Sequence, residues 1–316
     1  MLSLSPPAPG PVLALGNFDG VHRGHQVVLA AAREEARRLG TSAFALTMEP
    51  HPRRVFWPDS PSFRLTPPLA KERLVKALGL AGVIALPFSH DLARLTPDAF
   101  ITTFLVRTYQ AVAVVVGEGF VFGAKRAGSV RDLEEGLAPS GASVLTVPRV
   151  SLNEGGAELS STCARSALMQ GDLGTARAIL GRSWSILGEV THGQRLGRHL
   201  GFPTANIALG DYLHPRAGVY AVRVRREGVG GGLASGVANI GFRPTVQGKD
   251  MRLEVHLLEA PEGEAYGQTW EVFLESFLRP ERPFPDLDAL AAQIGEDVRA
   301  ARCALVGGGG RSPRVL

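Results

Sequence analysis

The N-terminal half of the chain alternates short apolar runs, rich in β-branched residues, with helical patterns. The runs occupy residues 12–15, 42–46, 83–86, 112–116 and 144–147. Between the first two runs, residues 25–39 show helical spacing and stop at Gly40, with one apolar face made by Val28, Leu29, Ala32, Ala36 and Leu39. This alternation predicts a parallel sheet whose strands are connected by helices.

After Ser183 the pattern changes to strands joined by turns. These strands are expected at residues 184–190, 219–225, 233–240, 253–258 and 270–277, which is typical of an antiparallel barrel or sandwich. A last helix is expected over 286–304. We therefore predict one domain at 1–182, a second at 183–305, and a disordered glycine-rich tail at 306–316. The glycines at 228–232 favour a hairpin loop, although a linker at that place is the alternative.

Size and composition are consistent with two globular domains. The chain has 316 residues, 45% apolar and 20% charged, with no apolar run long enough to cross a bilayer and no secretory signal pattern. Cys163 and Cys303 form no recognisable spacing, so we expect a reducing cytoplasm. The net charge of +4 is small and the arginines are scattered, which argues only weakly for nucleic-acid binding and equally fits an enzyme of anionic nucleotides. We expect neither nucleic acid nor membrane as a partner. Homo-oligomerisation stays open.

The strongest local signal is a glycine-rich turn that joins the first strand to the first helix. It runs over residues 16–25 as GNFDGVHRGH. Backbone N–H groups at a helix N-terminus bind anions, and His22 and His25 lie one turn apart, where both can face the same phosphates. The alternative is a tight turn that contains two incidental histidines. The position of the motif favours a site for a triphosphate.

A second segment combines hydroxyl groups with a cation at the start of a helical pattern. Ser160, Ser161 and Thr162 precede Arg165, and both kinds of side chain bind phosphate. On its own the segment is equally consistent with an ordinary helix cap followed by a surface arginine.

The C-terminal half contains a glycine-rich loop at residues 193–201 that ends in Phe202, Pro203, Thr204, Ala205 and Asn206. In an extended segment Thr204 and Asn206 point to the same side, where their oxygens suit Mg²⁺. A structural turn around Pro203 is the alternative. In the predicted strand 253–257, Glu254 and His256 share one face and the apolar residues share the other, so Glu254 is a candidate base, or part of a solvated strand face.

Taken together, the motifs resemble the bacterial bifunctional riboflavin kinase/FAD synthetase family. In the N-terminal half the resemblance is carried by residues 16–26, 49–52, 116–123 and 160–165; in the C-terminal half it is carried by residues 201–206, 218–220, 239–245, 253–256 and 277–279. The resemblance covers nearly the whole chain to about residue 305. It implies a Rossmann-like α/β nucleotidylyltransferase domain that adenylylates FMN to FAD, followed by an all-β six-stranded riboflavin kinase barrel with a C-terminal helix.

The resemblance also implies roles for individual residues. In the adenylyltransferase half, ATP would be bound by Gly16, Phe18, Asp19, His22, Gly24, His25, Ser161, Thr162 and Arg165. In the kinase half, ATP would be bound by Gly201, Pro203, Thr204 and Asn206, with Mg²⁺ on the last two. Glu254 would be the catalytic base. The flavin would contact Phe56, Phe122 and Arg279, although core packing explains the two phenylalanines equally well.

Two positions depart from the family pattern. Gly119 stands where the family usually has Asn or Asp, and Cys163 stands where it usually has Arg. One rival hypothesis is therefore a riboflavin kinase whose adenylyltransferase is weakened or inactive. Another is a flavin-binding regulatory protein or an RNA-binding module that keeps only the fold. The retained His22, His25 and Glu254 favour catalysis, and the lack of a basic, aromatic-rich stripe argues against RNA.

Overall fold

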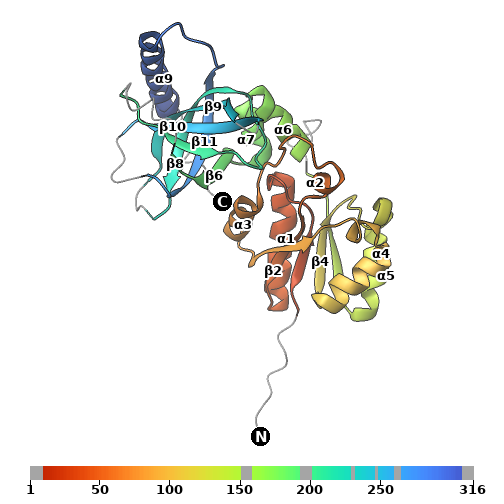
Figure 1. The fold of residues 1–316 in the computed structure, drawn as a ribbon. Coiled ribbons are helices and arrows are strands. Elements are labelled where there is room, and N and C mark those ends of the chain that lie inside the picture. Colours follow the sequence, from red (N-terminus) through yellow and green to blue (C-terminus); the bar gives the residue numbers. More distant parts are fainter. Residues whose placement is uncertain are drawn as a thin grey trace. The chain divides into compact units, whose positions relative to one another are not determined.

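The computed structural model describes residues 10–150, 159–192, 201–228, 232–245, 248–259 and 265–307, with the side chains of 243–250 outside the description (Figure 1). The chain forms two compact units. It passes from the first unit to the second after Pro61, returns after Ala70, and passes to the second again after Leu159. The units are described separately below.

The first unit is built on a five-stranded parallel sheet in the order β3-β2-β1-β4-β5. The strands are β1 (Val12–Leu15), β2 (Ala43–Glu49), β3 (Gly82–Pro87), β4 (Ala113–Gly117) and β5 (Ser143–Val147). The connections contain α1 (Arg23–Leu39), α2 (Pro52–Phe56), α3 (Pro68–Ala77), α4 (Pro97–Phe100), α5 (Val130–Leu137), the π-helix η2 (Ile101–Thr108) and the 3₁₀ turns η1 (Leu92–Arg94), η3 (Ala124–Arg126) and η4 (Ala138–Ser140). α3 crosses the division between the units.

Apolar side chains cover both faces of this sheet. On one face, Val28, Leu29 and Ala32 of α1 pack with alternate residues of the strands, and on the other face, residues of η2 and α5 do the same. Because β1 pairs with β2 on one side and β4 on the other, the chain reverses its direction of strand addition at β1. Ligands of open α/β sheets bind at the carboxyl edge beside such a reversal. The glycine-rich turn after β1 lies at this edge.

The second unit contains a six-stranded antiparallel sheet in the order β6-β11-β8-β9-β10-β7. Its strands are β6 (Ser185–Glu189), β7 (Ala205–Ala208), β8 (Gly218–Arg226), β9 (Ala234–Thr245), β10 (Gly248–Leu257) and β11 (Thr269–Arg279). A bridge between Thr191 and Asn206 joins the two outer strands and closes the sheet into a barrel. Among its described residues this part of the chain forms the helices α6 (Ser161–Gln170), α7 (Leu173–Leu180) and α9 (Leu287–Gly307).

Residues 62–70, here called the 62–70 segment, belong to the second unit although they lie between β2 and β3 in the sequence. Leu65 accepts a hydrogen bond of 2.8 Å from Trp184 Nε1, and Arg64 accepts one of 2.7 Å from the Leu213 N–H. Ser62 Oγ bonds to the Gly210 carbonyl at 3.1 Å. The segment is therefore an integral part of the barrel's surroundings.

The fold expected from the sequence is confirmed, with a parallel α/β sheet followed by a six-stranded antiparallel barrel and a C-terminal helix. Strand β1 has the predicted bounds, and the other expected strands begin or end within a few residues of those observed, except that β9 and β10 extend five residues further than predicted. The helix α9 extends to Gly307, and the rest of the expected tail lies outside the described residues. In the described part of the chain, no helix is both long enough and apolar enough to span a membrane.

Candidate active sites

The turn between β1 and α1 has a strained backbone. Phe18 and Val21 have positive φ angles of 47° and 42°, although neither residue is glycine. Each such residue costs about 1–3 kcal/mol and persists only where the surroundings fix it. Both side chains are buried, as is Asp19. The sequence therefore accepts local strain in order to hold this loop in one conformation at the carboxyl edge of the sheet.

His22 and His25 lie together at the start of α1. Their rings stack with centroids 3.5 Å apart, and the His25 N–H donates to His22 Nδ1 at 3.3 Å. Because Nδ1 accepts this bond, a neutral His22 carries its proton on Nε2, where it can donate to a phosphate oxygen. A side chain at Gly24 would crowd this arrangement, since a Cβ at that position would lie 3.2 Å from the His22 ring. Imidazole N–H groups at the positive end of a helix are donors of the kind that bind anions, so this arrangement suits the predicted phosphate role.

The predicted second phosphate segment forms the start of α6, in the second unit. Ser160 is the N-cap and accepts from the Cys163 N–H at 3.2 Å, while Ser161 and Thr162 are the first two helical residues. Arg165 donates from Nε to the Phe63 carbonyl at 2.9 Å, with its guanidinium 5.6 Å from the Phe63 ring centre. The structure thus places the histidines and this segment in different compact units. Cys163 supplies a backbone donor to the cap.

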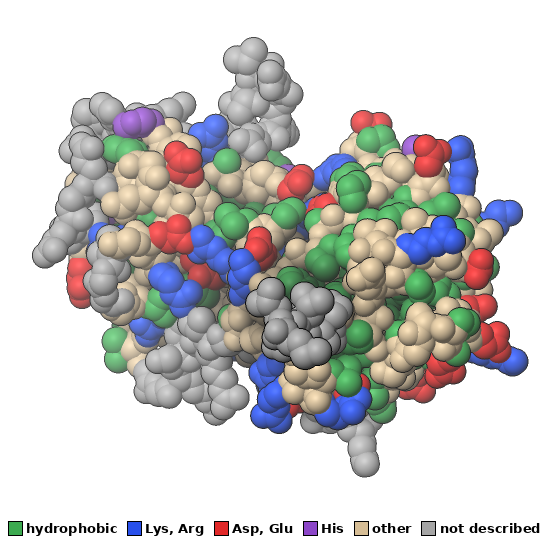
Figure 2. Space-filling view, turned by 90° about the horizontal axis from the view of Figure 1, so that it is seen from below, with side chains coloured by type: hydrophobic (Ala, Val, Ile, Leu, Met, Phe, Trp, Pro, Cys, Tyr) green, Lys and Arg blue, Asp and Glu red, His purple; other side chains and the backbone are tan. Residues whose placement is uncertain are grey.

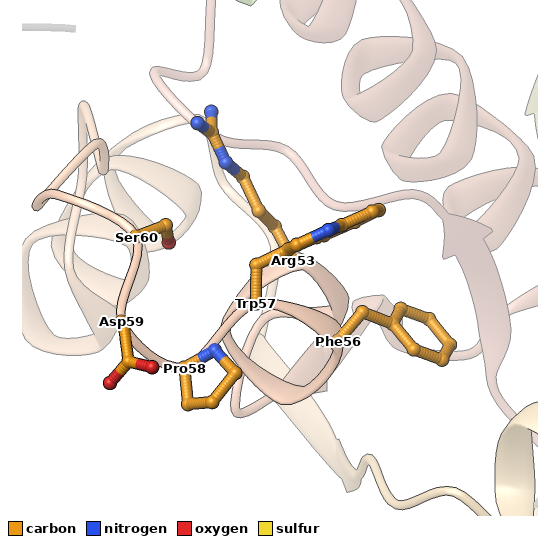
Figure 3. A pocket seen from close by; sticks show the side chains of 6 residues that line it. All are labelled: Arg53, Phe56, Trp57, Pro58, Asp59 and Ser60. Atoms are coloured by element: carbon orange, nitrogen blue, oxygen red, sulfur yellow. The ribbon is translucent and has the colours of Figure 1, made fainter.

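A pocket of about 630 Å³ lies beside α2 and is lined by Arg53, Phe56, Trp57, Pro58, Asp59 and Ser60 (Figure 3). Phe56 and Trp57 are 46% and 63% exposed, which is unusual for large aromatic side chains. Figure 3 shows Arg53 extending upward from α2, the ring of Trp57, the residue after this helix, lying toward the side of Phe56, and Phe56 directed away from Ser60. Flat exposed rings suit a flat ligand, and the lining adds one cation, Arg53, and one carboxylate, Asp59. Phe56 is thus at a surface pocket, whereas Phe122 is buried in the core against Phe100 and Phe120.

Gly119 lies beside the guanidinium of Arg149. Gly119 has a φ of +75°, a conformation that residues other than glycine, Asn and Asp seldom adopt. A Cβ at this position would lie 2.7 Å from Arg149 Nη2. The Arg149 side chain, held by a bond of 3.4 Å from Nε to the Glu118 carbonyl, fills the space that a larger residue would need. A guanidinium therefore lies beside the position at which the family that the sequence resembles usually has Asn or Asp.

In the barrel, the strand register brings three polar side chains into one row. Glu254 on β10 pairs with Asn206 on β7 and with Asn239 on β9. Directly paired residues point to the same face of a sheet. The predicted alternation of β10 is confirmed, because Leu253, Val255 and Leu257 are buried, whereas Glu254 and His256 are half-buried on the opposite face. Two amide side chains thus flank the carboxylate.

Asn206 has the properties of a metal ligand. Its side chain is 3% exposed, and Oδ1 has no hydrogen-bond partner among the described residues. A buried acceptor without a donor fits a bound cation. The preceding segment is held by His256, whose Nδ1 lies 2.9 Å from the Pro203 carbonyl and donates to it. Thr204 follows directly. The loop at 193–200 lies outside the described residues, and Gly201 begins the description again.

Arg279 at the end of β11 forms a bidentate ion pair with Asp297 of α9, from Nε at 2.8 Å and from Nη2 at 2.7 Å. Asp297 is 6% exposed, and Gln293 donates to it at 3.0 Å. The guanidinium is therefore fixed by α9, and its predicted flavin contact stays a prediction. The same region supplies residues that sequence reasoning missed: Asn239 donates to Glu281 Oε1 at 3.0 Å. Asn239 comes close to Glu254 only through the pairing of β9 with β10, which has no local sequence signal.

Burial shifts the pKa of two groups in the second unit. It lowers the pKa of Arg182 to about 10 and raises that of Tyr220, whose hydroxyl donates to the Arg216 carbonyl. Arg182 still carries its charge at neutral pH and donates to the Leu180 carbonyl at 3.2 Å. Both groups have structural partners. In the described part of the chain, no cluster of three or more His, Cys, Asp or Glu side chains could hold a metal ion.

Comparison with known proteins identifies both halves. The family model for FAD synthetase matches residues 5–163, and the model for riboflavin kinase matches residues 180–305. The chain is 40% identical to the bifunctional riboflavin kinase/FMN adenylyltransferase of Escherichia coli strain K12, covering 94% of this chain and 93% of the relative. It is also 40% identical to the enzyme of the same name from Pseudomonas fluorescens, over 95% and 94% of the two chains.

A crystal structure described as a macrolide-efflux protein from Streptococcus pneumoniae has the same fold. It superposes with a TM-score of 0.80 at 29% identity, covering 95% of this chain and 96% of the other. The name belongs to that protein alone, whereas the two family models together span both units described above. The chain is therefore a member of the bifunctional riboflavin kinase/FMN adenylyltransferase family.

Proposed function

We propose that this protein phosphorylates riboflavin to FMN with its barrel and adenylylates FMN to FAD with its nucleotidylyltransferase fold, using one ATP in each reaction. The row of Asn206, Glu254 and Asn239 supports the kinase assignment, because it places a carboxylate beside a buried oxygen donor suited to a metal. The stacked His22 and His25 at the start of α1 support the adenylyltransferase assignment.

In the kinase reaction, the 5′-hydroxyl of riboflavin attacks the γ-phosphorus of ATP, and ADP leaves. Glu254 accepts the hydroxyl proton as the new P–O bond forms, which is the task of a general base. Asn206 and Thr204 would hold Mg²⁺, which when bound neutralises charge on the ATP phosphates. A cation with two protein oxygens and phosphate oxygens as ligands fits the coordination that Mg²⁺ prefers. Gly201 and Pro203 would shape the loop beside ATP, and His256 holds that loop through Pro203.

In the adenylyl transfer, a phosphate oxygen of FMN attacks the α-phosphorus of ATP, and pyrophosphate leaves. Negative charge grows on the phosphates during this step, and preorganised donors stabilise it. We assign this role to His22 Nε2, His25 and the backbone of Gly16–Gly24, and the position of the histidines at the start of α1 supports the assignment. Phe56 and Trp57 offer the flavin ring a flat surface in their pocket. The participation of Asp19, Phe122, Ser161, Thr162, Arg165 and Arg279 stays a prediction.

Two variants test the assignments with one assay. The purified protein is incubated with riboflavin or FMN, ATP and Mg²⁺, and FMN and FAD are separated by chromatography. Glu254→Gln removes the proton acceptor and should lower FMN formation about 100- to 10,000-fold, while FAD formation from supplied FMN continues. His25→Ala should lower FAD formation by about 100- to 1,000-fold, with FMN formation unchanged. Equal losses of both activities in either variant would contradict the division of labour.

The same assay addresses the rival hypothesis of a kinase with an inactive adenylyltransferase. That hypothesis predicts FMN without FAD from the unaltered chain. We propose activity in both halves, because the stacked His22 and His25 are retained at the start of α1 and the models for both families match the chain. On the face drawn in Figure 2, basic side chains lie in several separate places with acidic ones among them. We propose a cytoplasmic enzyme whose partners are the small molecules ATP, riboflavin and FMN. Whether it forms homo-oligomers is left to experiment.

A further inference from the structure

The first unit contains a buried lysine that the mechanism above does not use. Lys71 of α3 is 2% exposed and is among the largest fully buried side chains of the protein. Its Nζ lies 3.3 Å from Thr47 Oγ1 and 3.4 Å from Glu49 Oε1 at the carboxyl end of β2. A buried ammonium is unfavourable unless polar partners compensate it, so its place beside the loop of His22 calls for an explanation.

The contact between Lys71 and Thr47 connects the lysine to the loop at residues 16–24, here called the nucleotide loop. The ammonium can only donate, so Thr47 Oγ1 accepts from Lys71 and directs its own hydrogen to the Asn17 carbonyl, 3.2 Å away. Asn17 directly precedes Phe18, where the strained part of the turn begins. A second anchor, the bond of 3.2 Å from the Gly16 N–H to the Leu46 carbonyl, ties the same loop to β2. The charge on Lys71 polarises the Thr47 hydroxyl and strengthens its hold on the loop.

The contact between Lys71 and Glu49 connects the lysine to the segment that forms the pocket beside α2. Glu49 ends β2, and three residues later α2 begins under the cap of His51, whose Nδ1 accepts from the Arg53 N–H at 3.1 Å. The pocket residues Phe56 and Trp57 follow at the end of that helix. Lys71 therefore contacts two residues of β2. Thr47 bonds to the loop after β1, and Glu49 precedes the segment that forms the pocket beside α2.

We propose that Lys71 is a positioning residue for adenylyl transfer. Through Thr47 it holds the nucleotide loop, and through Glu49 it holds the start of the chain that forms the flavin pocket. It contacts neither substrate. The inference rests on the proposed assignment of the loop to ATP. It extends that assignment by naming the side chain that couples the positions of the two binding segments within this unit.

The test separates the two contacts of Lys71 by steady-state kinetics of FAD formation. Thr47→Val keeps the shape of the side chain and removes the hydroxyl, so kcat/KM for ATP should fall about 10- to 100-fold, the effect of misplacing a binding group by about 1 Å. The KM for FMN should stay near its original value. Glu49→Gln should instead raise the KM for FMN. Lys71→Met removes the charge that contacts both Thr47 and Glu49, so it should lower kcat/KM for ATP and raise the KM for FMN.

Lys76→Met is the matched control, because Lys76 lies on the same helix with a 55% exposed side chain. Riboflavin phosphorylation, measured in every variant, reports on the other unit and should not change. In a double variant of Thr47 and Lys71, the loss in kcat/KM for ATP should be smaller than the product of the single losses, because both substitutions break one chain of contacts.

The proposal is overturned if folded Thr47→Val keeps the original kcat/KM for ATP. It is equally overturned if all three variants lose only heat resistance, or lose kcat without a split between the two KM values, since that is the signature of a merely structural role. Should Lys71→Met fail to fold, the Thr47 and Glu49 variants decide alone. The assignment of the loop has its own test: if His25→Ala retained full FAD formation, the loop would not bind ATP, whatever the Lys71 results.

Discussion

Replacing Leu65 with alanine should destabilise the kinase unit, although Leu65 lies within the part of the sequence that matches the FAD synthetase model. Its side chain is fully buried, and its carbonyl accepts the Trp184 Nε1–H at 2.8 Å from the start of the barrel. Removing a buried leucine side chain costs about 2–5 kcal/mol. For a unit of this size each kcal/mol lowers the unfolding temperature by about 2–4 °C, so a decrease of about 4–20 °C is expected.

The measurement is the riboflavin kinase activity that remains after brief heating, followed together with thermal unfolding. Leu69→Ala is the matched control, because Leu69 belongs to the same segment but is 56% exposed, and substitutions at such positions change stability by about 0.5 kcal/mol or less. If FMN formation were as heat-resistant in Leu65→Ala as in Leu69→Ala, the 62–70 segment would not contribute to the barrel's stability. The reasoning from the burial of its side chain would then fail.

Three further outcomes are expected. Asp172, the N-cap of α7, has its pKa lowered below 3.8 by its hydrogen bond with Thr175, so it stabilises the folded state above that pH and loses this contribution as the carboxylate is protonated. Asp172→Ala should therefore cost about 0.5–2 kcal/mol at pH 7, and its difference from the unaltered chain in unfolding experiments should shrink toward pH 3. Asn206→Ala should raise the Mg²⁺ concentration needed for half-maximal FMN formation, and an unchanged requirement would remove Asn206 from the metal site. Arg279→Lys breaks the bidentate pair with Asp297 and should cost about 1–3 kcal/mol of barrel stability in denaturant titrations, whereas a loss of riboflavin affinity without a loss of stability would favour a direct flavin contact.

Local patterns were sufficient to predict most of the fold. The helix α1 and strand β1 follow directly from apolar spacing, and the alternation in β10 correctly assigned Leu253 and Val255 to the buried face. Such features depend on a few neighbouring residues. The parallel pairing in one sheet and the antiparallel pairing in the other also agree with the predicted fold class, because each follows from the kind of connection between the strands.

The features that the sequence did not predict depend on contacts between residues distant in sequence. Asn239 joins Asn206 and Glu254 only through the pairing of β9 with β10, and nothing near Asn239 in the sequence indicates that pairing. The same holds for Lys71, whose helical neighbours do not show that its ammonium is buried against β2. Phe56 and Phe122 look alike in sequence, yet one is exposed at a pocket and the other is in the core.

The 62–70 segment also affects the order in which the chain can fold during synthesis. Its bond between Leu65 and Trp184 joins residues 119 positions apart. At roughly 5–20 residues per second, the ribosome needs about 6–24 s to make the intervening chain. During that time β3, β4 and β5 emerge and can complete the parallel sheet, whereas the 62–70 segment must wait without its partners. For an interval during synthesis, the first unit can therefore be folded while the 62–70 segment still lacks the residues of the second unit with which it bonds.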